Sequence, residues 1–276
     1  MALTTSTGAG ILTPEQVGIL LVTPVIEQSI ATTCTTVVTS DASSFRIPLV
    51  TVDPTASWVA EGAEITPSDA TISETDVAFK KVAGLSIITR ELSEDSSPAA
   101  AQVVGDGLAR DIARKVDAAF FANTTTNGPA GLGSLTTSVV TSGSAYTVDA
   151  FIDAIAAAAA VGAELETFVV SPADFVVLSK LKQATGSNVP LLQNDPAKPS
   201  GRIILGVPLV LSSAVAAGTA WGIPRSRTYV VIRNDATVET DNSVFFTSDR
   251  VAVRATMRVG FGFPHALALV KITHTV

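Results

Sequence analysis

The sequence is poor in the residues that most catalytic and metal sites use. It has one cysteine, Cys34, in 276 residues. An internal disulfide and a cysteine-based zinc site both need more than one thiol, so both are excluded, and we interpret Cys34 as a small buried hydrophobe. The only two histidines, His265 and His274, lie near the C-terminus. We expect His265 in a connection between strands and His274 in a solvated tail.

Motifs for catalysis are also missing. Two histidines leave few places for a charge-relay triad, and the sequence contains no Gly-x-Ser-x-Gly nucleophile turn and no His-Glu-x-x-His metal motif. A pair of carboxylates distant in sequence stays open as a catalytic arrangement, since the fold decides which acids meet. The interpretation we favour is that the chain is not an enzyme and uses no cofactor or metal ion.

Charged residues are few, and their balance is acidic. They make up 16% of the chain, against 47% hydrophobic residues, and the net charge is −7. This balance argues against a sequence-reading nucleic-acid binder, which would present a basic face. No apolar run is long enough to cross a membrane and no signal peptide opens the chain, so we expect synthesis in the cytosol and no membrane contact. The mean hydropathy of +0.43 indicates apolar surface shared between copies.

The strongest positive signal is a long amphipathic helix at residues 97–123. Ser97 and Pro98 form a favourable start, because a serine caps free amides and a proline fits the first helical turn. Apolar residues recur at helical spacing, which predicts one buried stripe. The stripe consists of Ala101, Val104, Leu108, Ile112, Val116, Ala119 and Phe120. We expect the charged residues on the solvated face, Asp117 among them, with Asp111 and Lys115 at the stabilising i,i+4 spacing.

The first 45 residues contain no lysine or arginine. Residues 1–12 are small and polar, which favours an extended arm that is ordered only against a partner. A short helix is predicted from Pro24 to Ile30. The β-branched runs TTVVTSD and SSFRIPLVTV, residues 35–41 and 43–52, have the character of paired strands.

Residues 53–76 contain six acids and no base. Their only large apolar residues are Trp58, Val59, Ile65 and Ile72, too few to form a core. Glycine and proline punctuate the segment, which predicts a long two-stranded hairpin that leaves the body and needs a partner surface. A calcium loop is the weaker alternative, since the alternating oxygen ligands of an EF-hand are absent.

Several motifs in this order resemble one known family. The runs WVAEG, TP and FKKVAGLSIITRELSEDS, followed by the long helix and by NGPAGLGSL, are similar to the major capsid proteins of tailed bacteriophages with the Hong Kong 97 fold. We expect Gly128, Gly131 and Gly133 to supply backbone angles closed to other residues. A phosphate-binding loop is disfavoured there, because no Gly-Lys-Ser/Thr sequence ends the run.

The similarity continues through the second half of the chain. A helix is predicted from Thr147 to Val161, then a buried strand, then a helix from Ser171-Pro172 through Lys182. The loop at 184–202 is of a length that usually binds or is disordered. The runs TYVVIRN, VFFTSDRVAVRATMRVGFGF and ALALVKIT read as strands that rebuild the first domain under the long helix.

The resemblance implies an α+β, Hong Kong 97-like capsid fold with five segments. These are an N-terminal arm and entry segment (1–45), an extended hairpin loop with its base strands (46–90), a peripheral domain with the long spine helix (91–145), an axial domain (146–224) and returning strands of the peripheral domain (225–276). The implied function is a major capsid protein that self-assembles through hexamers and pentamers into an icosahedral shell around double-stranded DNA. The implied location is the virion, assembled in the host cytoplasm.

Two other functions stay open at this stage. An encapsulin-type compartment has a similar fold but encloses cargo enzymes, and an ordinary α+β enzyme or adhesin is disfavoured by the missing catalytic motifs. For a capsid protein, the implied partners are other copies of the chain, a portal, and separate scaffolding or decoration proteins. The packaged DNA would be contacted only weakly and without sequence specificity. The start at Met1 suggests that no scaffolding region is fused ahead of the arm.

One departure from the family is specific. Some members crosslink a hairpin lysine to an asparagine of a neighbouring subunit, but residues 51–79 contain no lysine. Lys80 and Lys81 lie on the returning strand, so we predict a shell without covalent crosslinks. The candidate interface residues are Trp58 and the acids Glu61 and Glu64 of the hairpin, which we expect to meet Arg254 or Arg258 of another copy.

Overall fold

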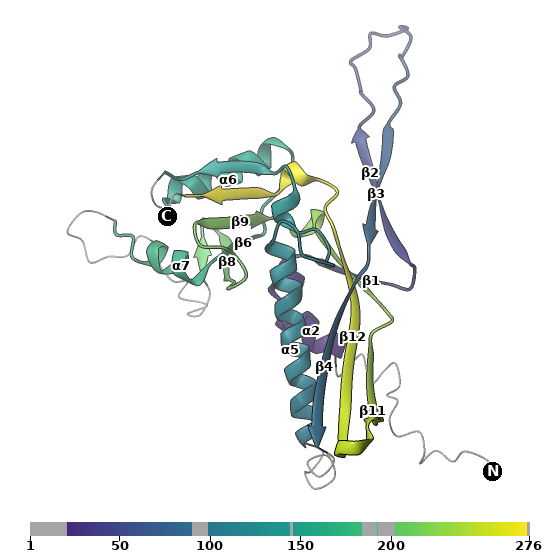
Figure 1. Cartoon of the computed structure of the whole chain (residues 1–276). Helices are drawn as coiled ribbons and strands as arrows, with labels where there is room; N and C mark the ends of the chain where they lie inside the picture. The colour runs from purple at the N-terminus through teal and green to yellow at the C-terminus, as the bar shows by residue number, and fades with distance from the viewer. Residues whose placement is uncertain (1–20, 90–98, 144–145, 184–191, 193–201, 275–276) are drawn as a thin grey trace.

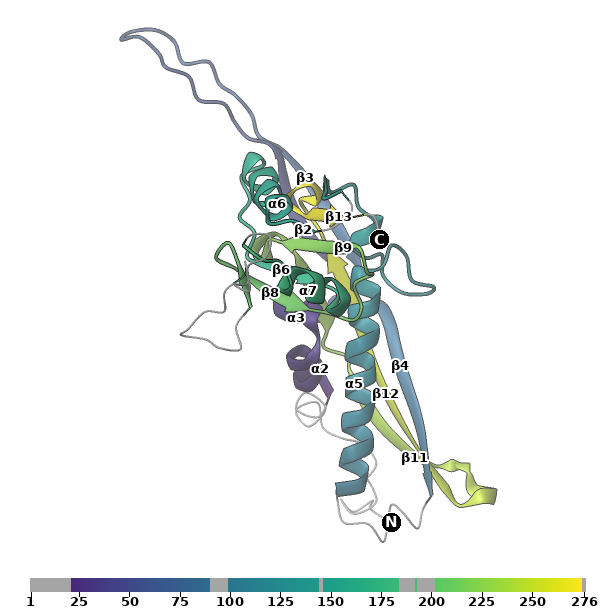
Figure 2. The ribbon, with the colours of Figure 1, turned by 90° about the vertical axis from the view of Figure 1, so that its left-hand side faces the viewer.

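The computed structural model describes residues 21–89, 99–143, 146–183, 192 and 202–274. Its long axis is marked by one helix lying beside long strands, with a second sheet and its helices toward one end and a thin hairpin projecting beyond (Figures 1 and 2). The predicted N-terminal arm, the Ser97-Pro98 helix start and almost all of the loop at 184–202 lie outside the described residues.

The first sheet has five strands built around the long strand β12 (Arg250–Gly262). On one edge of β12 lie β10 (Tyr229–Arg233) and β11 (Thr237–Phe245), and on the other lies β4 (Lys80–Thr89), all antiparallel to it. The fifth strand, β1 (Thr36–Ser40), is parallel to β10. The prediction that TTVVTSD pairs with the following run was therefore wrong, because β1 finds its partner almost 200 residues later in the sequence.

Helix α5 (Ala99–Phe121) covers this sheet, and its apolar stripe is confirmed from Leu108 to Phe120, while Val104 is half-buried outside the core cluster. Ile112, Val116 and Phe120 are almost fully buried. They belong to one core with residues of β12, among them Met257 and Phe261. The rings of Phe120 and Phe261 meet edge to face with their centroids 5.2 Å apart.

Asp117 is not on the solvated face, and that prediction was wrong. The residue is only 7% exposed. It accepts hydrogen bonds from the Ser29 hydroxyl at 2.6 Å and from the Ala31 and Ile30 amides at 2.9 and 3.2 Å. These amides open the short helix α3 (Ile30–Cys34), which follows α2 (Thr23–Gln28). Asp117 therefore supplies partners to helix amides that have none within their own helix.

Cys34 closes helix α3 and is buried, as predicted. Burial raises the pKa of its thiol to about 12. The thiolate, which is the reactive form of cysteine, is therefore scarce at neutral pH.

The second sheet has six strands in the order β5-β13-β9-β6-β8-β7. In chain order, these strands are β5 (Ser138–Thr141), β6 (Thr167–Val170), β7 (Ile203–Ile204), β8 (Val207–Leu211), β9 (Thr219–Ile223) and β13 (Val270–Thr273). ALALVKIT was predicted to rebuild the first sheet, but β13 pairs with β5 and β9 of the second. The last strand thus ties the C-terminal region to the body predicted to be the axial domain.

Helices α6 (Val148–Ala160) and α7 (Pro172–Ser179) accompany this second sheet. Phe151 of α6 packs edge to face on Phe168 of β6, in a core separate from the one under α5. The predicted Ser171 cap of α7 is confirmed, since its hydroxyl accepts a hydrogen bond from the Asp174 amide. The helix ends at Ser179, three residues before the predicted end at Lys182.

His265 lies between β12 and β13, as predicted, but His274 does not lie in a solvated tail. Its side chain is 8% exposed, with Nε2 3.3 Å from Oδ1 of the buried Asp174. Asp174 also accepts hydrogen bonds from the Gly218 amide and the Ser171 hydroxyl. The described C-terminal end is therefore fastened into the second sheet through a buried carboxylate.

Candidate assembly surfaces

The predicted hairpin is present as a two-stranded sheet with a long strand-free tip (Figure 1). Strands β2 (Ser44–Val52) and β3 (Thr71–Ala78) pair antiparallel. Residues 53–70 form no strand, so the two-stranded pairing is shorter than predicted. Two hydrogen bonds between Thr55 and Ser68, at 2.8 and 3.0 Å, hold the arms together, and a turn at Glu61 and Gly62 closes the tip.

The base of the hairpin is fixed to the first sheet by two glycines of β12. A side-chain carbon at Gly260 would lie 2.6 Å from Val77, and one at Gly262 would lie 2.5 Å from Ile47. Val77 and Ile47 are buried with Val231 of β10 in a small apolar cluster. The glycines in the GFGF run thus leave the room that the hairpin base occupies, and the direction of the hairpin follows from this packing.

The tip of the hairpin carries apolar residues that nothing in the described chain covers. Trp58 is fully exposed, and the side chain of Ile65 is 73% exposed. Glu61 and Glu64 are exposed beside them. The indole of tryptophan has more apolar area than most other side chains, so leaving it in contact with water is unfavourable, and burying it in a contact is correspondingly favourable. The tip therefore has the composition of a contact surface without its partner.

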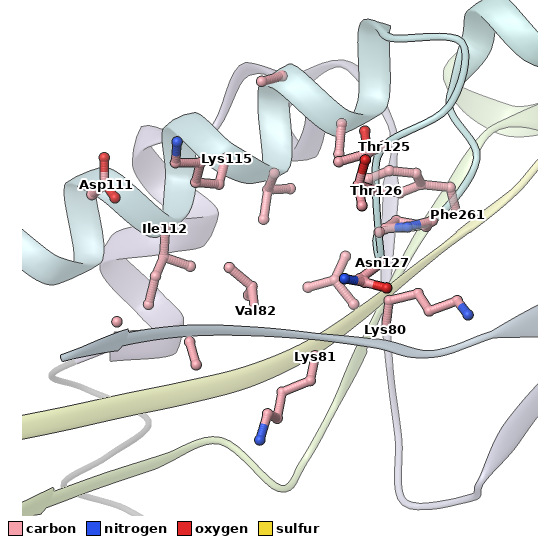
Figure 3. A pocket seen from close by; sticks show the side chains of 18 of the residues that line it. Lys80, Lys81, Val82, Asp111, Ile112, Lys115, Thr125, Thr126, Asn127 and Phe261 are labelled. Atoms are coloured by element: carbon pink, nitrogen blue, oxygen red, sulfur yellow. The ribbon is translucent and has the colours of Figure 1, made fainter.

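A groove of about 490 Å³ lies between α5 and β4 and is closed at one end by residues 125–129 (Figure 3). We name it the α5–β4 groove. Its walls are mainly apolar and come from Val82 of β4, Ile112 and Val116 of α5, and Phe261 of β12. Gly84 and Ala118 also line it. A side-chain carbon at Gly84 would lie 2.9 Å from Leu108, so this glycine lets α5 lie close to β4.

The turn that closes the groove is built by close approach of backbones. Asn127 has φ +59°, whereas Gly128, Gly131 and Gly133 do not have positive φ, so the predicted reason for these glycines was wrong. A side-chain carbon at Gly131 would lie 2.2 Å from the carbonyl oxygen of Ala119. The glycine is needed because the chain returns directly against the C-terminal end of α5.

The rim of the groove is basic. Lys80 borders it on the strand side and Lys115 on the helix side, while the side chain of Lys81 points away from α5 (Figure 3). Asp111 is the acid that lines the groove. The predicted Asp111–Lys115 ion pair does not form, and neither Lys80 nor Lys115 pairs with a carboxylate in the described part of the chain.

Arg254 and Arg258, the predicted partners of the hairpin acids, already have partners in their own chain. Arg254 pairs with Glu239 of the adjacent strand β11, and Arg258 pairs with Asp235. Both arginines line a polar hollow of about 260 Å³ on the sheet. Forming an intermolecular pair there would first require breaking an intramolecular one.

Within the single chain, the structure thus separates the predicted interface residues into two places. Trp58, Glu61 and Glu64 lie on the hairpin tip, and Arg254 and Arg258 lie on the sheet. The groove with Lys80 and Lys115 was missed by sequence reasoning. The signal available for it was weak, namely small residues on two elements that only the fold brings face to face. Within the described residues there is no group of three metal-ligating side chains and no helix able to span a membrane.

The sequence matches a model of a known protein family. The model described as the phage capsid family matches residues 9–274 of the sequence, which is nearly the whole chain. The chain belongs to the phage capsid family. It is a major capsid protein of the virion, and the comparisons give no support to the encapsulin alternative. A search of curated proteins finds no match.

Solved capsid structures have the same fold. The capsid of an empty GTA particle is 20% identical, with a TM-score of 0.74 over 88% of this chain and 89% of that one. A chain from Mycobacterium phage Adephagia is 20% identical, with a TM-score of 0.73 over 90% of each chain. One from Microbacterium phage Oxtober96 is 17% identical, with a TM-score of 0.73 over 90% and 91%. The predicted Hong Kong 97-like fold is confirmed.

Proposed function

We propose that this capsid protein closes an icosahedral shell around double-stranded DNA by laying its hairpin across a neighbouring subunit, without covalent crosslinks. The observation that carries the proposal is the hairpin tip, residues 53–70, which forms no strand and leaves Trp58 uncovered. Exposing such a residue in a folded protein is unfavourable unless a partner covers it. The N-terminal arm, residues 1–12, is assigned the same role on the basis of its composition.

The proposed hairpin contact is of a kind that can join subunits into closed rings. A tip on one copy and a receiving surface elsewhere on the next make a head-to-tail contact, in which the two partners use different surfaces. Such contacts generate closed rings when the rotation between copies closes. Hexamers and pentamers of a shell are rings of this kind. Family membership further supports a portal and separate scaffolding or decoration proteins as partners.

Shortening the hairpin tests the proposal. We would replace residues 55–68 with a two-residue turn, which removes the tip but keeps the pairing of β2 and β3. The expected product is a soluble subunit with unchanged helix content that forms no closed particles by electron microscopy. Deleting residues 1–12 should have the same outcome. Normal particles from both deletions would refute the role assigned to these segments.

The absence of crosslinks is tested by boiling mature particles in detergent. Because the hairpin has no lysine, we expect one band at the mass of the single chain, 28.3 kDa. A ladder of multimers would show that a covalent bond forms, and a much smaller band would show that the chain is cleaved during maturation. The ladder would contradict the proposal of a shell without crosslinks, and the smaller band would contradict the expectation of a full-length chain.

A further inference from the structure

We propose that Trp58 of one subunit inserts into the α5–β4 groove of the next subunit, with Glu61 and Glu64 meeting Lys80 and Lys115 at its rim. This rests on the proposed hairpin contact and names the surface that receives the hairpin. It also assigns Lys80 and Lys115 as the partners of the two acids, in place of Arg254 and Arg258, which the sequence predicted.

The apolar parts of the two surfaces fit one another. Trp58 is fully exposed on the tip, and the groove of about 490 Å³ is lined by Val82, Ile112 and Val116. An indole buries roughly 150–250 Å² of surface in a contact, more than most other side chains. A cavity of this volume lies within the range of roughly 300–1,000 Å³ that binding pockets have. The tip therefore carries the kind of anchor that the groove can hold.

The charges are complementary. Residues 51–79 contain no base, and the acids Glu61 and Glu64 lie in and just after the turn of the tip. Lys80 and Lys115 stand on opposite sides of the groove, without carboxylate partners in the described part of the chain. Complementary charges around an apolar anchor fix the orientation of a contact and exclude wrong partners. Asp111 also lines the groove, so the net charge of the lining remains basic but moderate.

The occupant is a second copy, because the hairpin cannot reach its own groove. Strand β3 ends at Ala78 and β4 begins at Lys80, so the groove starts where the hairpin leaves the body. Each arm of the tip, residues 53–60 and 63–70, has eight residues, and an extended arm covers roughly 3.3 Å per residue, or roughly 26 Å. The tip points away from α5 along this length (Figures 1 and 2).

Tryptophan quenching is the first test. The chain has two tryptophans, and Trp221 is buried at 3% exposure, so acrylamide quenching of free subunits reports mainly Trp58. We expect several-fold weaker quenching of Trp58 in closed particles, with a blue shift of its emission. Closed particles in which Trp58 stays as accessible as in free subunits would overturn the inference but not the proposed function. If no particles form, the proposed function itself fails.

Blocking the groove is the second test. Ala118 lines the groove and is exposed on α5, so Ala118→Phe fills the space without entering the core. Ala156→Phe on α6 is the matched control, an exposed helical alanine outside the groove. We expect both variants to fold with equal melting temperatures and only Ala118→Phe to lose closed particles. Equal yields of particles from both variants would contradict the inference.

Disulfide trapping locates the tip directly. Cys34 is buried with a raised thiol pKa, so it should not interfere. Ala60→Cys combined with Thr126→Cys places one thiol on the tip and one at the closed end of the groove. Oxidised particles should give a ladder in steps of 28.3 kDa. The control pairs Ala60→Cys with Thr237→Cys, beside Arg254, and should give none. The reverse pattern would place the tip on the arginine face and overturn the inference.

Discussion

The chain places its apolar residues in two opposite ways. Under α5, Phe120 is completely buried among other rings, and the body has its own core. On the hairpin, Trp58 is completely exposed and the tip has no strand pairing. Burial of Phe120 indicates that the body supplies free energy of folding, and on the function proposed above the exposed tip supplies free energy of assembly instead. Substitutions in the two regions should therefore affect different measurements.

The largest expected contrast is between two aromatic truncations. Phe120→Ala empties a site that contacts Phe121 and Phe261, with ring centroids 5.1 and 5.2 Å away. We expect it to lower the free energy of unfolding by about 3–5 kcal/mol. Trp58→Ala should change the same quantity by less than about 0.5 kcal/mol, because no described residue covers the indole in the free subunit. Denaturant unfolding of free subunits measures both. Similar losses in the two variants would remove the distinction between body and tip.

A second contrast uses two glycines. Gly131→Ala would place a carbon against the backbone of α5, and we expect a loss of about 1–3 kcal/mol from strain in a packed region. Gly62→Ala has no neighbour within 4 Å and meets only the strain of φ +81° at the turn of the tip. Since that turn is outside the core and can relax, the strain should lower the unfolding free energy by about 1 kcal/mol at most, and the main effect should be a fall in particle yield. A melting curve and a particle count for each variant decide this.

A smaller effect concerns pH and the body alone. Burial raises the pKa of Asp117 above its ordinary value of 3.8, despite the hydrogen bonds from Ser29 and Ala31 that lower it. The folded state then binds the proton more tightly than the unfolded state. The carboxyl group of Asp117 therefore stabilises the folded state most below pH 3.8, and this stabilisation is lost as pH rises through the raised pKa. Asn does not titrate. The stability of wild type relative to Asp117→Asn should therefore decline with rising pH in that window, and an increase would contradict the assignment.

The smallest effect is expected for DNA. With a net charge of −7 and Arg254 and Arg258 paired to acids, free subunits should bind duplex DNA weakly and release it at modest salt. Replacing Glu239 and Asp235 by their amides frees both arginines and also Arg233, which pairs with Asp235. The slope of log affinity against log salt should then steepen by no more than about 0.9 for each freed arginine. Tight binding by wild type that persists in high salt would contradict this expectation.

Local patterns predicted much of the fold. The stripe through Ile112 and Val116, the Ser171 cap and the unsupported hairpin all follow from spacing or composition within one segment, and each is present. The motif order also identified the family, which a model over residues 9–274 confirms.

The predictions that the structure contradicts share one cause, which is contact between residues far apart in the sequence. Asp117 is buried because Ser29 lies against it, 88 residues earlier, and His274 is buried because Asp174 lies against it, 100 residues earlier. Strand β13 joins the second sheet for the same reason. The groove is lined by Lys80 of β4 and Lys115 of α5, two elements that only the fold brings side by side. No local periodicity encodes such pairs, so the surface proposed to receive the hairpin could be found only from the folded structure.

The most direct test of the account compares wild type and Trp58→Ala by electron microscopy after identical assembly. Wild type should give closed particles, whereas Trp58→Ala should give subunits with the same circular dichroism spectrum and melting temperature but few or no closed particles. Closed shells of equal yield and stability from Trp58→Ala would contradict the claim that the hairpin tip holds the shell together.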